Sequence, residues 1–276
     1  MNGKAKTADH LMIALAVVAG AGSIGLFAWD ARPTFVPMMW PPGAALAWDA
    51  FLSLVFFVQH SGMVRRPFRA RLASVLTARY DGAFYAICSG LTLMLVVVFW
   101  QRVDTPVFRL EGVARWIAVA SSGLVAALLV FSGYAVRRTI DFLGLKPIRA
   151  HLRGGTPPST PFIVDGPYRW VRHPLYSCIL ALLWVRPEMM ADGLLLSILW
   201  SGWIVVGTVL EERDLVEDFG DVYRRYQQQV PMLVPWRGPV SVRVERAKDG
   251  PGLIRNASAV SRVGRDHRRP GTSGRC

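Results

Sequence analysis

Charged residues are scarce in this sequence, and three long stretches contain none. Only 18% of its 276 residues are charged and 52% are hydrophobic, whereas an ordinary soluble domain has about 25% charged residues. No Asp, Glu, Lys or Arg occurs in 10–29, 82–101 or 116–136. Because about 20 apolar residues in a helix cross a hydrocarbon core of about 30 Å, each stretch predicts a membrane span. An ordinary soluble globular fold is therefore excluded.

Cysteine is scarce as well. The three cysteines, Cys88, Cys178 and Cys276, lie far apart in the sequence. This spacing excludes a disulfide framework and the paired ligands of a structural zinc site, so we predict no metal site. The sequence also shows no internal repeat of the kind that marks many transporters.

Three further apolar stretches complete the expected architecture, at 44–64, 174–186 and 193–210. The second of these is short and ends just before Pro187, so it is either a tilted span or a half-helix. We predict an all-α fold, a polytopic transmembrane helical bundle of five to six spans within residues 1–236, with a cofactor-binding segment at the membrane interface. Residues 237–276 are rich in Gly, Ser and Arg and lack apolar periodicity, which predicts a basic, disordered cytoplasmic tail.

The basic residues, which give a net charge of +13, are distributed unevenly over the loops. They concentrate before the first expected span, after the second and after the fourth, and the loops between are poorer in Lys and Arg. The positive-inside rule therefore predicts cytoplasmic N- and C-termini in a bacterial-type inner membrane. Membrane placement accounts for the charge without nucleic acid as a partner, and the basic tail suits contact with anionic membrane lipids.

The segment Asp165–Tyr176 carries the densest chemistry in the sequence, reading DGPYRWVRHPLY. Asp-Gly-Pro is a turn signal, and Pro174 suits the first position of a helix. A helix beginning here would present free N–H groups and a positive dipole that suit a carboxylate. The alternative interpretation is an ordinary interfacial belt of aromatic and basic side chains, which accounts for Trp170 but not for Arg, His, Pro and Tyr packed together.

A second segment, from Glu211 to Tyr226, begins where the last expected span leaves the membrane. Its apolar and aromatic residues fall on one face at helical spacing until Gly220, which is expected to break the helix. The adjacent acids Glu211 and Glu212 need solvent or cationic partners, and Arg169, Arg172 and His173 are the natural ones. The alternative is a solvated surface cluster with ordinary helical ion pairs.

Together the two segments resemble the isoprenylcysteine carboxyl methyltransferase superfamily, which shares an Arg-His-Pro-x-Tyr element and a Glu-Glu…Phe-Gly…Tyr…Tyr element with phospholipid N-methyltransferases. The resemblance is closer to the bacterial NnrU-like branch that contains methanethiol S-methyltransferase, and it covers about residues 10–236. The matching features are Trp48-Asp49, Phe57-Val58-Gln59-His60-Ser61, Asp141-Phe142-Leu143-Gly144-Leu145, the run from Gly166 to Tyr176, Glu211-Glu212-Arg213-Asp214-Leu215 and Val230-Pro231-Met232-Leu233.

The resemblance implies an S-adenosylmethionine site built from the last two helices and their flanking segments. The expected cofactor-binding residues are Tyr168, His173, Pro174, Tyr176, Glu212, Tyr223 and Tyr226. The expected catalytic residues are His60, Arg172 and Glu211. His60 and Asp49 are weighed separately, because polar groups in a span are functional candidates but also occur at headgroup level. For His173, a role as cofactor ligand is favoured over a role as general base.

The function favoured by the resemblance is methylation of a small thiol, methanethiol, to dimethyl sulfide. Two departures from the family pattern bear on the acceptor: Cys178 replaces a frequent glycine, and Gln227–Gln229 stand where a basic residue is frequent, which weakens carboxyl methylation. The alternatives are methylation of a lipid or prenylated acceptor, a non-catalytic NnrU-like membrane protein, and, more distantly, a reductase using a nicotinamide cofactor.

Overall fold

The computed structural model describes residues 3–28, 34–136, 140–156, 162 and 164–240. Within these residues, five helices are long and apolar enough to cross a membrane: Ala5–Gly25, Pro42–Val64, Ala78–Phe99, Gly112–Val136 and Ala191–Phe219. This confirms the predicted polytopic helical bundle. Of the predicted tail 237–276, the part beyond residue 240 lies outside the described residues.

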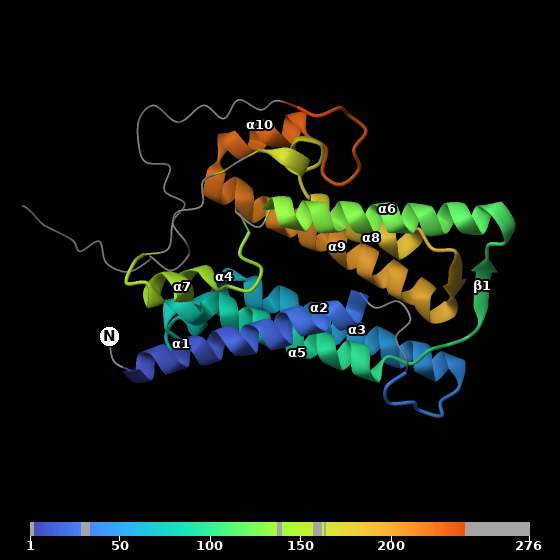
Figure 1. Ribbon diagram of the computed structural model, residues 1–276, viewed down its shortest axis with the longest axis horizontal. Helices are drawn as coiled ribbons and strands as arrows, with labels where there is room; N and C mark the ends of the chain where they lie inside the picture. Colours follow the sequence, from blue (N-terminus) through green and yellow to red (C-terminus); the bar gives the residue numbers. More distant parts are fainter. Residues whose placement is uncertain (1–2, 29–33, 137–139, 157–161, 163, 241–276) are drawn as a thin grey trace, which may run out of the picture.

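The helices are named in chain order (Figure 1). The first span is continuous through α1 (Gly3–Ala16), the π-helix η1 (Val17–Ala21) and α2 (Gly22–Ala28). The elements that follow are α3 (Pro42–Val64), α4 (Arg66–Leu72), η2 (Ala78–Tyr80), α5 (Asp81–Phe99), β1 (Pro106–Arg109), α6 (Gly112–Val136), α7 (Lys146–Leu152), η3 (Gly166–Arg169), α8 (Pro174–Trp184), β2 (Glu188–Met190), α9 (Ala191–Phe219) and α10 (Asp221–Gln229).

Two of the expected boundaries differ from the structure. The first helix begins at Gly3 instead of residue 10, and it tolerates Asp9 because the carboxylate is held by Arg79 and His151 at 3.1 and 2.8 Å. The fifth of the expected stretches, 174–186, is the eleven-residue helix α8 (Pro174–Trp184). At about 1.5 Å per residue it covers only about half of the hydrocarbon thickness, so it is the half-helix of the two alternatives.

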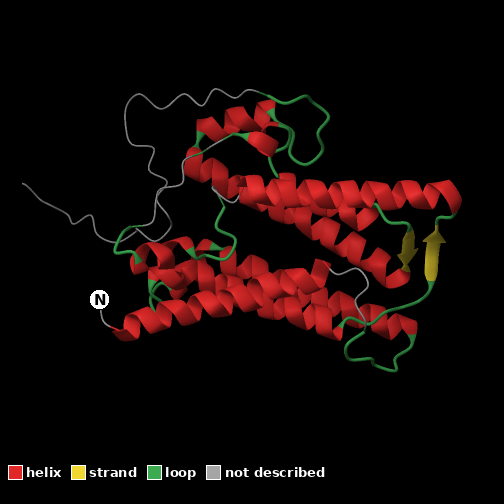
Figure 2. Ribbon diagram, in the orientation of Figure 1, coloured by secondary structure: helices red, strands yellow, loops and turns green. Residues whose placement is uncertain are grey.

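The helices form two layers (Figures 1 and 2). One layer contains α1, α2, α3 and α5, and the other contains α6, α8 and α9. The α3 and α9 helices pack against each other and join the layers. A short antiparallel β1–β2 ladder, which the sequence did not predict, closes one end of the molecule. We call this the hairpin end. The opposite end carries α4, α7 and α10, and we call it the motif end.

Aromatic rings form the core where the layers meet. Phe56 of α3 stacks on Trp200 of α9 at 5.2 Å between ring centroids, and Phe57 stacks on Trp203 at 4.7 Å. Phe27 of α2 stacks on the other side of Trp200 at 4.6 Å. Aromatic pairs of this kind are worth about 0.5–1.5 kcal/mol each beyond their buried area, so they hold α3 firmly against α9.

Two glycines permit close backbone approach within the first layer. A Cβ on Gly90 would lie 2.3 Å from the carbonyl oxygen of Ala19, and one on Gly144 would lie 2.1 Å from the carbonyl carbon of Gly82. Gly144 also has a φ of +64°, which favours glycine. The segment preceding α7 therefore lies directly against the start of α5, and Asp141 completes this turn by accepting hydrogen bonds from the Leu145 and Lys146 amides.

Asp49 lies at the hairpin end, away from the motif segments. Its side chain is fully buried, and its Oδ1 accepts a hydrogen bond of 2.9 Å from the backbone N–H of Gln101. The Gln101 side chain in turn donates to the Val36 carbonyl and accepts from the Met38 amide. Asp49 thus helps to join α3, the end of α5 and the loop before α3, which is a structural role.

Candidate active site

The motif segment is shaped by its own turn residues. Asp165 accepts a hydrogen bond from the Gly166 amide, and Gly166 has a φ of +55°. After the short η3 helix, His173 has φ −127° and ψ 69°, which is neither helical nor the extended conformation expected before a proline, and Pro174 begins α8. The predicted helix start at Pro174 is confirmed. Arg169 does not reach the acids of α9; its Nε donates to the Val240 carbonyl instead.

Arg172 and Glu212 join the two motif segments. The Nε and Nη2 of Arg172 donate to the two carboxylate oxygens of Glu212 at 2.6 and 2.9 Å. Both side chains are only 9% exposed. Paired, two-point contacts between guanidinium and carboxylate are strong and fix orientation. Because both charges are buried and bonded to each other, the pair fixes the segment before α8 against the end of α9.

The same pair anchors the segment after α9. Arg172 Nη1 donates to the backbone carbonyls of Gln227 and Val230, and the Gln227 side chain donates to Glu212 at 2.8 Å. The backbone continues the connection, since the amides of Arg172 and His173 donate to the carbonyls of Pro231 and Met232. We call Arg172, Glu212 and Gln227 the clamp.

Tyr223 and Tyr226 of α10 are buried against Phe162, Phe219 and Val230. The hydroxyl of Tyr226 donates to the Tyr168 carbonyl at 2.7 Å. Burial raises the pKa of both tyrosines above the ordinary range, so both hydroxyls stay protonated at neutral pH. The structure thus brings three of the predicted cofactor residues, Tyr168, Tyr223 and Tyr226, to the motif end. There the two tyrosines of α10 belong to the hydrophobic core that supports the clamp.

His173, Tyr176 and Glu211 lie together beside the clamp. His173 lies 3.0 Å from Glu212 through Nε2 and 3.9 Å from Glu211 through Nδ1. Its ring stacks on Tyr176 with an interplanar angle of 6°. The two adjacent acids therefore have different environments: Glu212 is enclosed, whereas the Glu211 side chain is 46% exposed. Glu211 is the acid that remains accessible to a ligand.

His60 of α3 lies against α5 and α9. Its ring nitrogens are 2.7 and 3.1 Å from the hydroxyl of Tyr85, and its ring packs against Phe56 and Trp203. Sequence reasoning missed Tyr85 and the role of Gln227. A single tyrosine near the start of an apolar span is commonly an interfacial residue, and the only signal for Gln227 was its departure from the basic residue of the family pattern.

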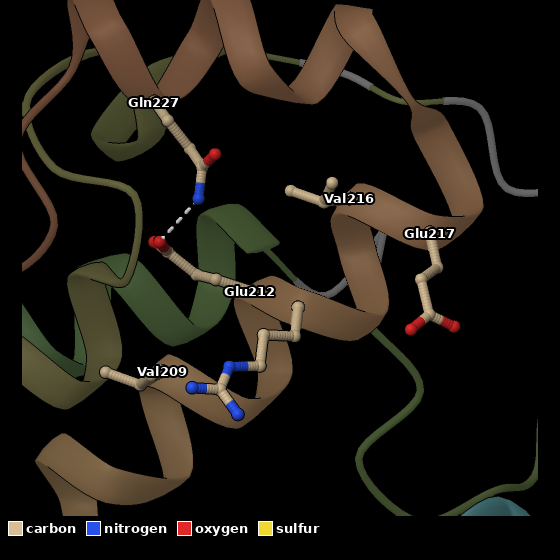
Figure 3. A pocket seen from close by; sticks show the side chains of 6 residues that line it. Val209, Glu212, Val216, Glu217 and Gln227 are labelled. Atoms are coloured by element: carbon tan, nitrogen blue, oxygen red, sulfur yellow. Dashed lines mark hydrogen bonds between the residues drawn. The ribbon is translucent and has the colours of Figure 1, made fainter.

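A cavity of about 420 Å³ adjoins the clamp (Figure 3). Its lining comes from the last part of α9 and from α10, and two of its lining residues, Glu212 and Gln227, are joined by the hydrogen bond drawn in Figure 3. The volume falls in the range of about 300–1,000 Å³ typical of small-molecule sites. Within the described residues, no group of three or more His, Cys, Asp or Glu could hold a metal ion.

Comparisons with known proteins agree with the resemblance. The family model described as "NnrU protein" matches residues 50–240. Methanethiol S-methyltransferase from Pseudomonas sp. (strain GM41(2012)) is 35% identical over 205 residues, covering 74% of this chain and 78% of the relative. Methanethiol S-methyltransferase 1 from Bradyrhizobium diazoefficiens is 33% identical, covering 70% and 67%. Nurim from Rattus norvegicus is 33% identical, covering 62% and 68%. No solved structure matches.

Proposed function

This chain belongs to the NnrU protein family, and on that premise we propose that it is an integral-membrane methyltransferase that S-methylates a small thiol, methanethiol, with S-adenosylmethionine as the methyl donor. The observation that carries the proposal is the difference between the two adjacent acids. The clamp holds Glu212 in place, and Glu211 is left accessible beside His173 and Tyr176.

The residues at the end of α9 fit such a donor chemically. S-adenosylmethionine carries a sulfonium, an ammonium group and a carboxylate, and it supplies a methyl group on positively charged sulfur. Glu211 offers a carboxylate to the positive charges, and the N-terminus of α8 suits the donor carboxylate. The proposed cofactor-binding residues are Tyr168, His173, Pro174, Tyr176, Glu212, Tyr223 and Tyr226, of which Tyr168, Glu212, Tyr223 and Tyr226 act through packing and the clamp.

The remaining task of the chain is alignment and exclusion of water. Methyl transfer from sulfonium disperses charge, so the rate depends mainly on the geometry of the two reactants and on a dry site. Arg172, the first of the proposed catalytic residues, acts by fixing Glu212 and hence α9. Glu211 orients the donor. His60 acts on the acceptor side, where the thiol must lose its proton because the thiolate is the better nucleophile.

A lipid or prenylated acceptor is the second candidate. The observation favouring it is the wide exposed apolar surface of α6, including Val113, Trp116 and Ile117, which would face lipid in any case. Against an anionic acceptor, Gln227 stands where a basic residue is frequent and is engaged in the clamp. A non-catalytic protein would need no accessible acid at Glu211. The experiment at the end of this subsection distinguishes thiol methylation, lipid methylation and the absence of catalysis.

We further propose the orientation and domain boundaries. The motif end carries the arginines of α4 and the basic residues of α7, so the positive-inside rule places it, with both chain termini, on the cytoplasmic side of a bacterial inner membrane. Residues 1–236 form the membrane domain. Residues 237–276 form a basic tail beside anionic lipids. Fusion reporters at residue 276 and in the loop before β1 test this topology.

The test of function uses membranes from cells that express the chain, with empty-vector membranes as the control. Methanethiol and S-adenosylmethionine are supplied, and dimethyl sulfide is measured by headspace gas chromatography. We expect dimethyl sulfide above the control, lost in His173→Ala. With expression verified, label from the donor methyl group in extracted lipid instead of volatile sulfide would support the lipid alternative. Neither product, together with no donor binding, would support the non-catalytic one.

A further inference from the structure

His60 and Tyr85 form a polar pair that lies outside both motif segments. They belong to different helices, α3 and α5, and the Tyr85 hydroxyl lies 2.7 Å from Nε2 of His60. Both side chains are partly exposed. A polar pair within a membrane span is costly unless it has a function or is fully satisfied. The pair is therefore a candidate for contact with a substrate that reaches the space between the helices.

The surroundings of this pair are rigid and aromatic. Phe56 and Trp203 lie 5.1 and 5.2 Å from the His60 ring between centroids. The indole N–H of Trp203 donates to the Ser61 hydroxyl at 3.0 Å, which fixes the orientation of its ring.

The pair also lies toward the proposed donor site. Trp203, against which the His60 ring packs, lies on α9, the helix that also carries Glu211. A cavity of about 200 Å³ borders Tyr85 toward the motif end, with Arg69 and Asp81 in its lining. This volume is smaller than the range of about 300–1,000 Å³ that is typical of small-molecule sites.

We propose that the acceptor thiol binds against the Tyr85 hydroxyl, and that His60 accepts the thiol proton through Tyr85. This inference rests on the proposed methyltransferase function and extends it to the acceptor side. Tyr85 is then a catalytic residue, since it touches the reacting thiol. His60 is a positioning residue that acts through Tyr85.

In the proposed step the acceptor sulfur gains a methyl group and loses its proton. The acceptor sulfur forms a bond to the methyl carbon, the donor carbon–sulfur bond breaks, and its electron pair stays on the donor sulfur. The acceptor S–H bond breaks, and its proton passes to the Tyr85 oxygen while the Tyr85 hydroxyl proton passes to a nitrogen of neutral His60. A weak base is sufficient, because the S–H proton becomes strongly acidic as the new bond forms. His60 then releases the proton to water.

The experiment compares Tyr85→Phe and His60→Gln with the wild type in detergent-solubilised full-length protein. Tyr134→Phe is the matched control, because Tyr134 is an exposed tyrosine of α6. Three quantities are measured: kcat/KM for methanethiol, kcat/KM for thiophenol, and the Kd for S-adenosylmethionine by equilibrium dialysis. Thiophenol is the informative acceptor, because it is already an anion at about pH 8 and needs no base.

For Tyr85→Phe we expect kcat/KM for methanethiol to fall about 100-fold, the size of a general-base contribution, with a loss of less than about threefold for thiophenol. We expect His60→Gln, which can accept a hydrogen bond but not a proton, to show the same pattern. Donor Kd is expected to stay within about twofold of the wild type in all variants.

An equal loss for both thiols, a weakened donor Kd, or Tyr85→Phe kinetics matching those of Tyr134→Phe would overturn the inference. A wild-type protein that methylates neither thiol would instead overturn the proposed function itself. The two failures are therefore distinguishable.

Discussion

Arg172 and Glu212 are 40 positions apart in the chain, yet they share two hydrogen bonds in an almost fully enclosed ion pair. This contact joins the segment before α8 to the end of α9. Because Gln227 and the carbonyl of Val230 complete the same cluster, three separate segments depend on one pair of charges. The groups beside it, the accessible Glu211 and the buried His173, keep their positions only while the pair is intact.

Breaking the clamp is expected to destabilise the protein. Glu212→Leu leaves the buried Arg172 charge without its partner, which typically costs about 3–5 kcal/mol. We expect a clearly lower thermal midpoint in detergent and loss of donor binding. In the double variant Arg172→Met/Glu212→Leu, both charges are removed, so much of the stability is expected to return. If Arg172→Met/Glu212→Leu were no more stable than Glu212→Leu, the unpaired charge of Arg172 would not be the cause of the lost stability.

Glu211→Gln is expected to affect binding instead of stability. Since its side chain is half-exposed and the nearest ring nitrogen of His173 is 3.9 Å away, removing the charge has little structural cost. Losing one charge-assisted contact to the donor should weaken the Kd for S-adenosylmethionine by about tenfold. Asp218→Asn, a similarly exposed acid on the same helix, is the control and should leave the Kd unchanged. Similar affinities for both variants would remove Glu211 from the donor site.

Gly144→Ala tests the close approach of the α7 segment to α5. The added Cβ would meet the Gly82 carbonyl carbon at 2.1 Å and would require a φ of +64°. We expect a loss of about 1–3 kcal/mol in stability from the strained backbone alone, seen as a lower thermal midpoint. Gly123→Ala provides the comparison, because a Cβ there has no neighbour within 4 Å. It lies within helix α6, so alanine should be neutral or slightly stabilising.

The hairpin end should show a pH dependence. The hydrogen bond from Arg109 to Glu188, 2.8 Å long, lowers the pKa of Glu188 below the ordinary value of a glutamate side chain. A depressed carboxyl pKa stabilises the folded state above the unfolded pKa, and this contribution is lost as the pH falls through the folded pKa. Glu188→Gln should therefore melt earlier than the wild type at neutral pH, and the difference should shrink under acid conditions below the ordinary range of Glu. A difference that is constant with pH would contradict this.

The spans and the helix starts could be read from the sequence because they depend on local properties. A stretch of 20 residues without charge suits only a membrane interior, and Pro174 suits only the start of a helix. For the same reason the break at Gly220 was predicted, and it is confirmed by its φ of +58° between α9 and α10. The β1–β2 ladder was not predicted, because each strand is only three or four residues long and gains its partner from a segment about 80 residues away.

The composition and order of residues by themselves determined that this chain is a helical membrane protein with two chemically dense segments at one end. They did not determine which residues of those segments are enclosed and which remain accessible. Which of the two adjacent acids is enclosed depends on the direction each side chain takes from α9 and on which cation lies there after folding. The pairing of His60 with Tyr85 likewise depends on how α3 and α5 are rotated against each other. Tertiary structure decided both, because contacts between distant segments are set by packing and leave no periodic trace in the sequence.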